Sequence, residues 1–317
     1  MKMWARLFGR QVMWSARHPL PSALRAECNG SRRRFESGDM SPHSKWAMQF
    51  LDKATGRGRK TASAARGWAG GVGMRRFRVI LEYEGTAYHG WQVQPGLPTI
   101  QGLLQAALGR IAGTPVQVTG AGRTDAGVHA LGQVASFSAD LRLDPPTLRR
   151  ALNASLPRDI VVCSVEEAGA EFDARRSARS KMYRYTLLCR DHPSAWLGRH
   201  SLYVPRSLNI QAMAEAARLV VGTHDFSAFR AGTCAAKSPV RTVLDATWRN
   251  EGDLWHFEIT ANAFLQHMVR ILVGTLLDVG RGKRRPAEVG AVLDSRDRRR
   301  AGKTAAPQAL CLVEVQY

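Results

Sequence analysis

The chain has 317 residues, 44% of them apolar, which is enough to bury a sizeable core in one large domain or in two halves. Lysine and arginine outnumber aspartate and glutamate by 46 to 26, and the formal charge of +20 favours a polyphosphate partner such as nucleic acid. The five cysteines form no C-x-x-C pair, which argues against a cysteine zinc or redox site. No apolar run is long enough to span a bilayer, so we expect a cytoplasmic protein with no membrane segment.

The segment 1–74 differs from the rest of the chain in charge. It contains 14 Lys and Arg and 4 Asp and Glu (14 − 4 = +10), half of the total charge, and it ends in a glycine-rich run before Met74. No sustained periodicity is present, so we predict disorder or weak helix. It could be a basic RNA-binding arm, an arginine-rich targeting peptide, or an artefact of a wrongly assigned start. We favour a start at Met74, because the first strong structural signal follows it directly.

The N-terminal half, residues 75–175, is predicted to mix strands and helices. Apolar and polar residues alternate in the first strand, as expected for a half-buried strand, and Thr99 can cap the first helix. The second helix begins with proline. The predicted strands are residues 77–83, 116–119, 132–137 and 160–165, and the predicted helices are residues 100–111 and 146–156.

The C-terminal half, residues 176–317, repeats this mixture. Because neither half follows a strict β-α-β-α order, we predict an α+β fold and not a doubly wound parallel sheet. The long helix has apolar residues on more than one side, so we expect it in the core, with Arg270 as a polar exception. The predicted strands are residues 182–189, 240–249, 254–261 and 311–316, and the predicted helices are residues 209–221, 264–279 and a short one from Pro286.

The densest group of polar residues is the loop from Gly120 to His129, between two apolar strands. Its glycines permit positive φ and close approach of a ligand to the backbone. Asp125 beside Arg123 would be a carboxylate held ionised by a cation, competent as a nucleophile or base. The alternative is an aspartate that closes an Asx-turn, with a solvated arginine beside it.

Four segments together resemble one known family. Arg123–Ala130 is similar to the signature of the tRNA pseudouridine synthase A (TruA) family. Segments 81–92, 182–185 and 261–270 resemble further motifs of that family in the same order. The resemblance covers residues 76–317, whereas residues 1–74 match nothing in the family.

The resemblance implies a pseudouridine synthase fold, in which two α/β halves share a long, mostly antiparallel sheet with a central basic cleft. It also implies a homodimer in which one tRNA touches both subunits. The implied reaction converts uridine to pseudouridine at positions 38–40 of the tRNA anticodon stem-loop. No electrons are gained or lost in this isomerisation, so we expect neither a cofactor nor a metal ion.

The family's catalytic aspartate falls on Asp125, the tyrosine of its Tyr-x-Tyr strand on Tyr183, and its basic Met-Val-Arg residue on Arg270. Asp125 could attack C1′, add to C6 of the base or remove the 2′ proton, and the sequence does not choose among these routes. Arg270 could keep the carboxylate charged. Tyr183 could stack on a flipped base, or it could be a core tyrosine. Arg123 is expected to act as a wedge or a phosphate anchor.

Further basic residues could contact RNA phosphates or could form a merely solvated basic surface. They are Arg175, Arg176, Arg179, Lys181 and Arg184. Two other functions compete with the isomerase, namely a non-catalytic RNA-binding module and a hydrolase. A non-catalytic RNA-binding module needs no carboxylate beside phosphates, and a hydrolase would need a general acid or metal site that the sequence does not supply.

Overall fold

The computed structural model describes residues 73–205 and 207–317, so the predictions for the N-terminal segment up to residue 72 lie outside the described residues. The strands are β1 (Arg75–Tyr83), β2 (Val118–Gly120), β3 (His129–Ala139), β4 (Ile160–Glu167), β5 (Ser180–Cys189), β6 (Leu202–Val204), β7 (Gly222–Asp225), β8 (Val240–Glu251), β9 (Leu254–Ala261) and β10 (Leu310–Gln316). The α-helices are α2 (Ile100–Ala112), α3 (Pro145–Ser155), α4 (Ile210–Arg218), α5 (Met268–Gly280) and α6 (Glu288–Ser295).

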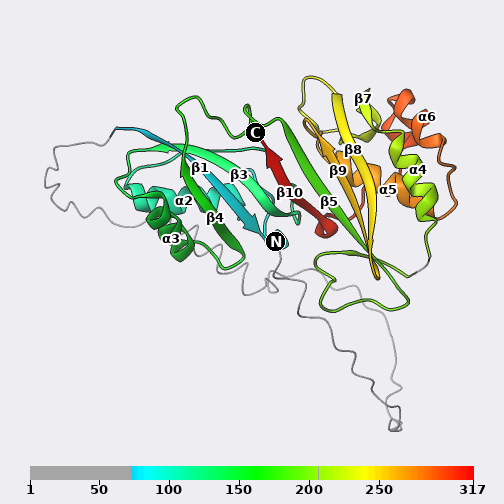
Figure 1. The fold of residues 1–317 in the computed structure, drawn as a ribbon, viewed down its shortest axis with the longest axis horizontal. Coiled ribbons are helices and arrows are strands. Elements are labelled where there is room, and N and C mark those ends of the chain that lie inside the picture. The colour runs from blue at the N-terminus through cyan, green and yellow to red at the C-terminus, as the bar shows by residue number, and fades with distance from the viewer. Residues whose placement is uncertain (1–72, 206) are drawn as a thin grey trace, which may run out of the picture. The chain divides into compact units, whose positions relative to one another are not determined.

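All ten strands of the described residues belong to one sheet, in the order β4-β1-β3-β10-β5-β9-β8-β7, with β2 paired to β3 and β6 paired to β5. Neighbouring strands run antiparallel except for two pairs, β10 with β3 and β5 with β6. The helices α2 and α3 lie beside the N-terminal strands and α4 and α5 beside the C-terminal strands (Figure 1). The predicted α+β fold with a long, mostly antiparallel sheet is therefore confirmed.

The last strand of the chain joins the two halves of the sheet. β10 lies between β3 of the N-terminal half and β5 of the C-terminal half (Figure 1). Leu312, in the middle of β10, is fully buried and is paired with Ala130 on one side and Tyr183 on the other. One strand thus pairs both with the strand after the Gly120–His129 loop and with the strand of the Tyr-x-Tyr motif. The domain boundary at residues 175 and 176 stays a prediction.

The N-terminal elements form for the reasons that their patterns indicate. The alternating residues Phe77, Val79, Leu81 and Tyr83 of β1 are buried, and Phe77 stacks on Phe137 of β3 with ring centroids 5.2 Å apart. Thr99 caps α2 by accepting a hydrogen bond from the Gly102 N–H, and Asp144 caps α3 in the same way. These caps satisfy amide groups that have no partner within the helix.

The C-terminal half departs from the prediction in three places. Helix α5 begins at Met268 and not at residue 264, because His267 adopts a left-handed conformation (φ 62°) that no helical residue has. Helix α4 ends at Arg218, three residues early. The strands β6 and β7 were not predicted, since three or four residues are too short to establish an alternating pattern. Eleven residues of α5 are buried, as expected for a core helix.

Candidate active site

The loop between β2 and β3 is held on a rigid base. The Ala121 N–H donates to the Val134 carbonyl (2.7 Å), and the Trp91 N–H donates to the Thr124 carbonyl (3.0 Å). Gly90 has a φ of 82°, and a Cβ atom there would lie 2.5 Å from the Thr124 carbonyl oxygen. Only glycine permits this approach, so the backbone beside Asp125 rests directly on the preceding loop.

Buried polar side chains also hold the same loop through hydrogen bonds. The Tyr83 hydroxyl and the Thr124 hydroxyl are hydrogen bonded at 2.8 Å. The fully buried Gln133 amide donates to the Gly122 carbonyl (2.9 Å) and to the Tyr83 hydroxyl (3.3 Å). Because each of these groups is buried, breaking one bond would leave a partner unsatisfied, and this cost fixes the loop in one conformation.

Asp125 forms an ion pair with Arg270 of α5. The Arg270 Nη1 donates to Asp125 Oδ2 at 2.9 Å, and Arg270 Nε donates to the Ala305 carbonyl at 2.8 Å. The arginine side chain is 13% exposed and that of Asp125 is 23% exposed. The carbonyl of Ala305 thus orients the guanidinium, so that Nη1 points at the carboxylate. A hydrogen bond between two charged groups is shorter and stronger than one between neutral groups.

A second residue of the same helix end faces the carboxylate. His267 Nε2 lies 3.5 Å from Asp125 Oδ2, and His267 directly precedes the first turn of α5. His267 makes no capping hydrogen bond with its side chain, so the ring is turned toward Asp125 and not toward the helix amides. The N-terminal end of α5 therefore approaches the carboxylate, and the positive end of a helix dipole stabilises negative charge there.

Tyr183 of β5 completes the group. It is 6% exposed, and its ring meets Phe264 edge to face with centroids 5.0 Å apart. Burial raises the pKa of the Tyr183 hydroxyl above its usual range, and the nearby Tyr83 and Asp125 raise it further. A phenol in this setting stays protonated at neutral pH, so it can donate a hydrogen bond but is a poor base.

The structure separates the other predicted residues. Arg123 is exposed, and within residues 73–205 and 207–317 it forms no ion pair, so the cation beside Asp125 is Arg270 and not its sequence neighbour. Of the basic candidates, Arg184 pairs with Glu258 at 2.6 Å. Arg175 and Arg176 are exposed, whereas Lys181 is buried. Adjacency in the sequence therefore did not identify the partner, because the packing of α5 against the loop brings Arg270 to Asp125.

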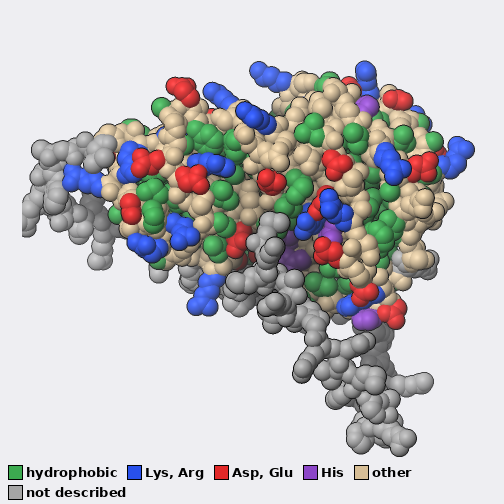
Figure 2. Space-filling model, in the orientation of Figure 1, with side chains coloured by type: hydrophobic (Ala, Val, Ile, Leu, Met, Phe, Trp, Pro, Cys, Tyr) green, Lys and Arg blue, Asp and Glu red, His purple; other side chains and the backbone are tan. Residues whose placement is uncertain are grey.

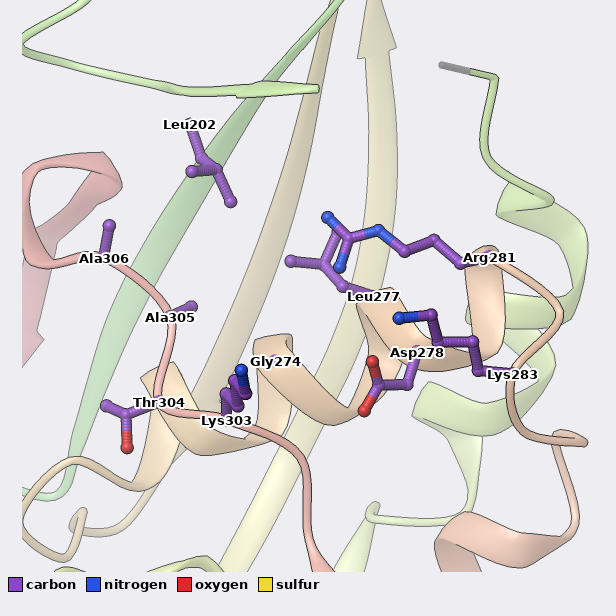
Figure 3. Close-up of a pocket in the computed structure, with 10 residues that line it drawn as sticks. All are labelled: Leu202, Gly274, Leu277, Asp278, Arg281, Lys283, Lys303, Thr304, Ala305 and Ala306. Atoms are coloured by element: carbon purple, nitrogen blue, oxygen red, sulfur yellow. The ribbon is translucent and has the colours of Figure 1, made fainter. Parts of the chain in front are cut away.

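A cavity lies beside this site and not in it. It has a volume of about 500 Å³ and is lined by α5 and by residues 303–306, among others. Figure 3 shows Gly274 and Leu277 of α5 on one side of it and Ala305 on the other. Asp125, Tyr183 and Arg270 do not line it. Its connection to the site is the backbone of Ala305, which holds Arg270.

One group of side chains has the spacing of metal ligands, namely Glu84, His129 and His200. The His129 Nδ1 accepts a hydrogen bond from the Gly85 N–H, and Nε2 lies 2.9 Å from the carbonyls of Arg199 and Gln308. Both ring nitrogens thus already have partners. The imidazole acts as a link between three chain segments, and a metal ion could bind it only by breaking one of these bonds.

Surface charge on the face drawn in Figure 2 is mixed, with Lys and Arg side chains interspersed with Asp and Glu. The central basic cleft stays a prediction. Within the described ranges, no helix combines the length and the apolar character that crossing a membrane requires.

Two site residues were not singled out from the sequence. His267 was assigned no role, and Phe264 was placed in the helix predicted over residues 264–279. The spacing of His267 and Arg270, three residues apart, is a signal that could have found the first, because such residues share one face of a helix end. No sequence signal identifies the Ala305 carbonyl, which acts through its backbone.

Comparison with known proteins identifies the family. A family model described as tRNA pseudouridine synthase matches residues 79–175 and 216–317. The tRNA pseudouridine synthase A of Acetivibrio thermocellus is 44% identical over 244 residues, which make up 77% of this chain and 100% of that protein. The proteins of the same name from Geotalea uraniireducens and Myxococcus xanthus are each 46% identical to this chain over 77% of its length. The matched region makes up 100% of the first protein and 92% of the second. The chain therefore belongs to the tRNA pseudouridine synthase A family, a family of isomerases.

Proposed function

We propose that this protein converts uridine to pseudouridine at positions 38–40 of the tRNA anticodon stem-loop, with Asp125 as the catalytic carboxylate. The observation that carries this proposal is the contact between Asp125 and Arg270 on a rigid loop, with Tyr183 beside them. The related proteins carry the name tRNA pseudouridine synthase A, which supports tRNA as the substrate.

The chemistry explains why an ionised carboxylate is needed. The bond between ribose C1′ and N1 of the base is broken, the base rotates, and a bond between C1′ and C5 forms. Attack at C1′, addition at C6 and removal of the 2′ proton all begin with a negatively charged carboxylate oxygen. Arg270 and the N-terminal end of α5 place positive charge next to that oxygen.

Tyr183 is proposed to contact the base. Its ring offers a face for stacking on an everted uracil, as in other enzymes that take a base out of the stack. Among the described residues its hydroxyl has no hydrogen-bond partner, so it is available to donate to the base. Because burial keeps this hydroxyl protonated, Tyr183 is assigned hydrogen-bond donation and not proton abstraction at C5.

Arg123 is proposed to stabilise the everted nucleotide from the rim of the site. Taking a base out of a helix costs a few kcal/mol. An exposed guanidinium two residues before Asp125 can offset part of this cost by filling the space or by binding a phosphate.

The homodimer, with one tRNA touching both subunits, belongs to the same proposal, as does a cytoplasmic location.

The test uses tRNA that carries tritium at C5 of uridine. Isomerisation replaces the C5 hydrogen and releases the label, whereas binding alone and phosphodiester hydrolysis do not. The wild-type protein is expected to release tritium, and Asp125→Asn is expected to release none while retaining tRNA on a filter. Asp140→Asn is the matched control, because Asp140 is exposed beyond the end of β3.

The outcomes separate the alternatives. If the wild-type protein binds tRNA and releases no tritium, the non-catalytic RNA-binding module is correct. If Asp125→Asn keeps full turnover, the isomerase stands and the assignment of Asp125 is wrong. Sequencing of the product for pseudouridine then locates the modified position within the anticodon stem-loop.

A further inference from the structure

Lys181 is a buried residue whose charge has no anionic partner among the described residues. Only 7% of the residue is exposed, yet within residues 73–205 and 207–317 its ammonium forms no ion pair and no hydrogen bond. Burial of a charged group costs free energy unless a partner compensates for it, and buried lysines are rarely unpaired. Arg184, on the same strand, follows the usual pattern, since Glu258 neutralises it.

The position of Lys181 relates it to the catalytic loop. Lys181 precedes Tyr183 by two residues on β5, so both side chains lie on the same face of the sheet. A Cβ atom on Gly122 would lie 3.5 Å from Cε of Lys181 and 3.9 Å from the hydroxyl of Tyr183. The lysine stem and the tyrosine hydroxyl thus border the same glycine, three residues before Asp125.

Two further cations act on the charge of Lys181. Burial lowers the pKa of the Lys181 ammonium, and the positive charges of Arg175 and Arg241 lower it further. Arg175 is exposed, and Arg241 donates from Nη1 to the carbonyls of Ser238 and Val240. The Nε of Arg241 is buried and has no hydrogen-bond partner among the described residues. Among the described residues neither arginine forms an ion pair, so none of their carboxylates neutralises the three positive charges.

We propose that Lys181, with Arg175 and Arg241, binds a backbone phosphate of the RNA next to the target nucleotide. The substrate class rests on the proposed function. Three uncompensated cations favour a fully charged ligand over a base carbonyl, because only a negative charge offsets their repulsion. The lysine stem and the Tyr183 hydroxyl border the same glycine near Asp125, so a phosphate held by Lys181 would lie beside the everted base and fix its ribose.

Two measurements on the full chain should change in opposite directions. Lys181→Gln and Lys181→Met remove the uncompensated charge, so the melting temperature is expected to rise by about 2–4 °C. The affinity for tRNA is expected to fall about 10- to 100-fold. The slope of log K against log salt concentration should also become shallower by about 0.7–0.9, the value for one phosphate contact. Lys181→Arg keeps the charge and should keep the salt slope.

A second experiment identifies the ligand as a phosphate. A set of anticodon stem-loops, each with one neutral methylphosphonate linkage near the target uridine, is bound to wild-type protein and to Lys181→Gln. One linkage is expected to weaken wild-type binding and to have no further effect on the variant, because its phosphate contact is already lost. Lys283→Gln, at an exposed lysine after α5, is the control for net charge and should respond to every linkage as the wild type does.

The proposal is wrong if both neutral variants melt at a lower temperature than the wild type, which would make Lys181 a structural residue. It is also wrong if every methylphosphonate weakens the wild type and Lys181→Gln equally. Tritium release by the wild-type protein is measured in parallel. If the wild-type protein releases tritium but the Lys181 variants keep its salt slope, only the phosphate site is wrong. If the wild-type protein releases no tritium but the variants show the shallower slope, the isomerase is wrong and the RNA phosphate site stands.

Discussion

Arg270 connects the candidate carboxylate to a distant part of the chain. Its guanidinium bonds both to Asp125 and to the Ala305 carbonyl, and its own carbonyl accepts a hydrogen bond from the Ala305 N–H (3.0 Å). Three hydrogen bonds thus fix the position of Arg270 relative to the loop that carries Asp125. A lysine could supply the charge but not the planar, forked set of donors.

We therefore expect Arg270→Lys to lower the rate of tritium release about 10- to 100-fold, with tRNA binding retained. The reason is the loss of one charged hydrogen bond, about 1.5–3 kcal/mol, where about 1.4 kcal/mol corresponds to a factor of ten. Arg75→Lys is the matched control. Arg75 also bonds to a carboxylate, that of Glu167, and to two carbonyls, but at the opposite end of β3 from Asp125. Equal losses in both variants would contradict a specific role for Arg270.

Helix α5 positions the site because another chain segment crosses it closely. A Cβ atom on Gly274 would lie 1.7 Å from the Lys303 carbonyl oxygen, and one on Gly302 would lie 2.7 Å from the backbone of Gly274. The Gly302 N–H also donates to the hydroxyl of Thr275 (2.9 Å). The segment that ends at Ala305 thus lies directly on the helix, and this contact brings the Ala305 carbonyl to Arg270.

Gly274→Ala is expected to destabilise the protein by about 1–3 kcal/mol and to reduce tritium release, because the added methyl group pushes the crossing segment away from α5. Gly290→Ala in α6 is the control. There the added carbon would meet only a leucine side chain at 3.8 Å, so we expect the usual gain of about 0.5–1 kcal/mol for alanine in a helix. Thermal unfolding and the tritium assay check both variants. Unchanged activity in a destabilised Gly274→Ala would show that the crossing matters for stability alone.

At the scale of the whole molecule, the sheet joins elements that are far apart in the chain. β10 contributes residues 310–316 to a position between β3 and β5, so the final strand pairs with the strand that follows the catalytic loop and with the strand that carries Tyr183. The described strands begin at Arg75, and the similarity to the relative from Acetivibrio thermocellus covers 77% of this chain and all of that protein.

A chain beginning at Met74 is accordingly expected to equal the full chain in tritium release, because it retains every strand and helix described. The affinity for tRNA, measured by filter binding at several salt concentrations, is the companion measurement. A large loss of affinity with a shallower salt slope would assign the basic segment 1–73 to an RNA-binding arm.

Local patterns in the sequence were sufficient for most elements. The alternation in β1, the Thr99 cap of α2 and the apolar surface of α5 are properties of neighbouring residues, and each was predicted. The start of α5 was placed too early, because the left-handed conformation of His267 depends on contacts outside the helix. Short strands such as β6 also depend on pairing with a partner strand and carry little pattern of their own.

The family and the identity of Asp125, Tyr183 and Arg270 as candidates could be read from the residues, since motifs are local in the chain. The pairing of Asp125 with Arg270, 145 residues later, could not be derived from spacing, and the local argument had assigned Arg123 to that place. That Lys181 forms no ion pair within residues 73–205 and 207–317 was equally hidden. Chain neighbours are set by covalent bonds, whereas ion pairs and burial are set by which strands and helices pack together. Here that packing depends on the last strand, which joins the two halves of the sheet.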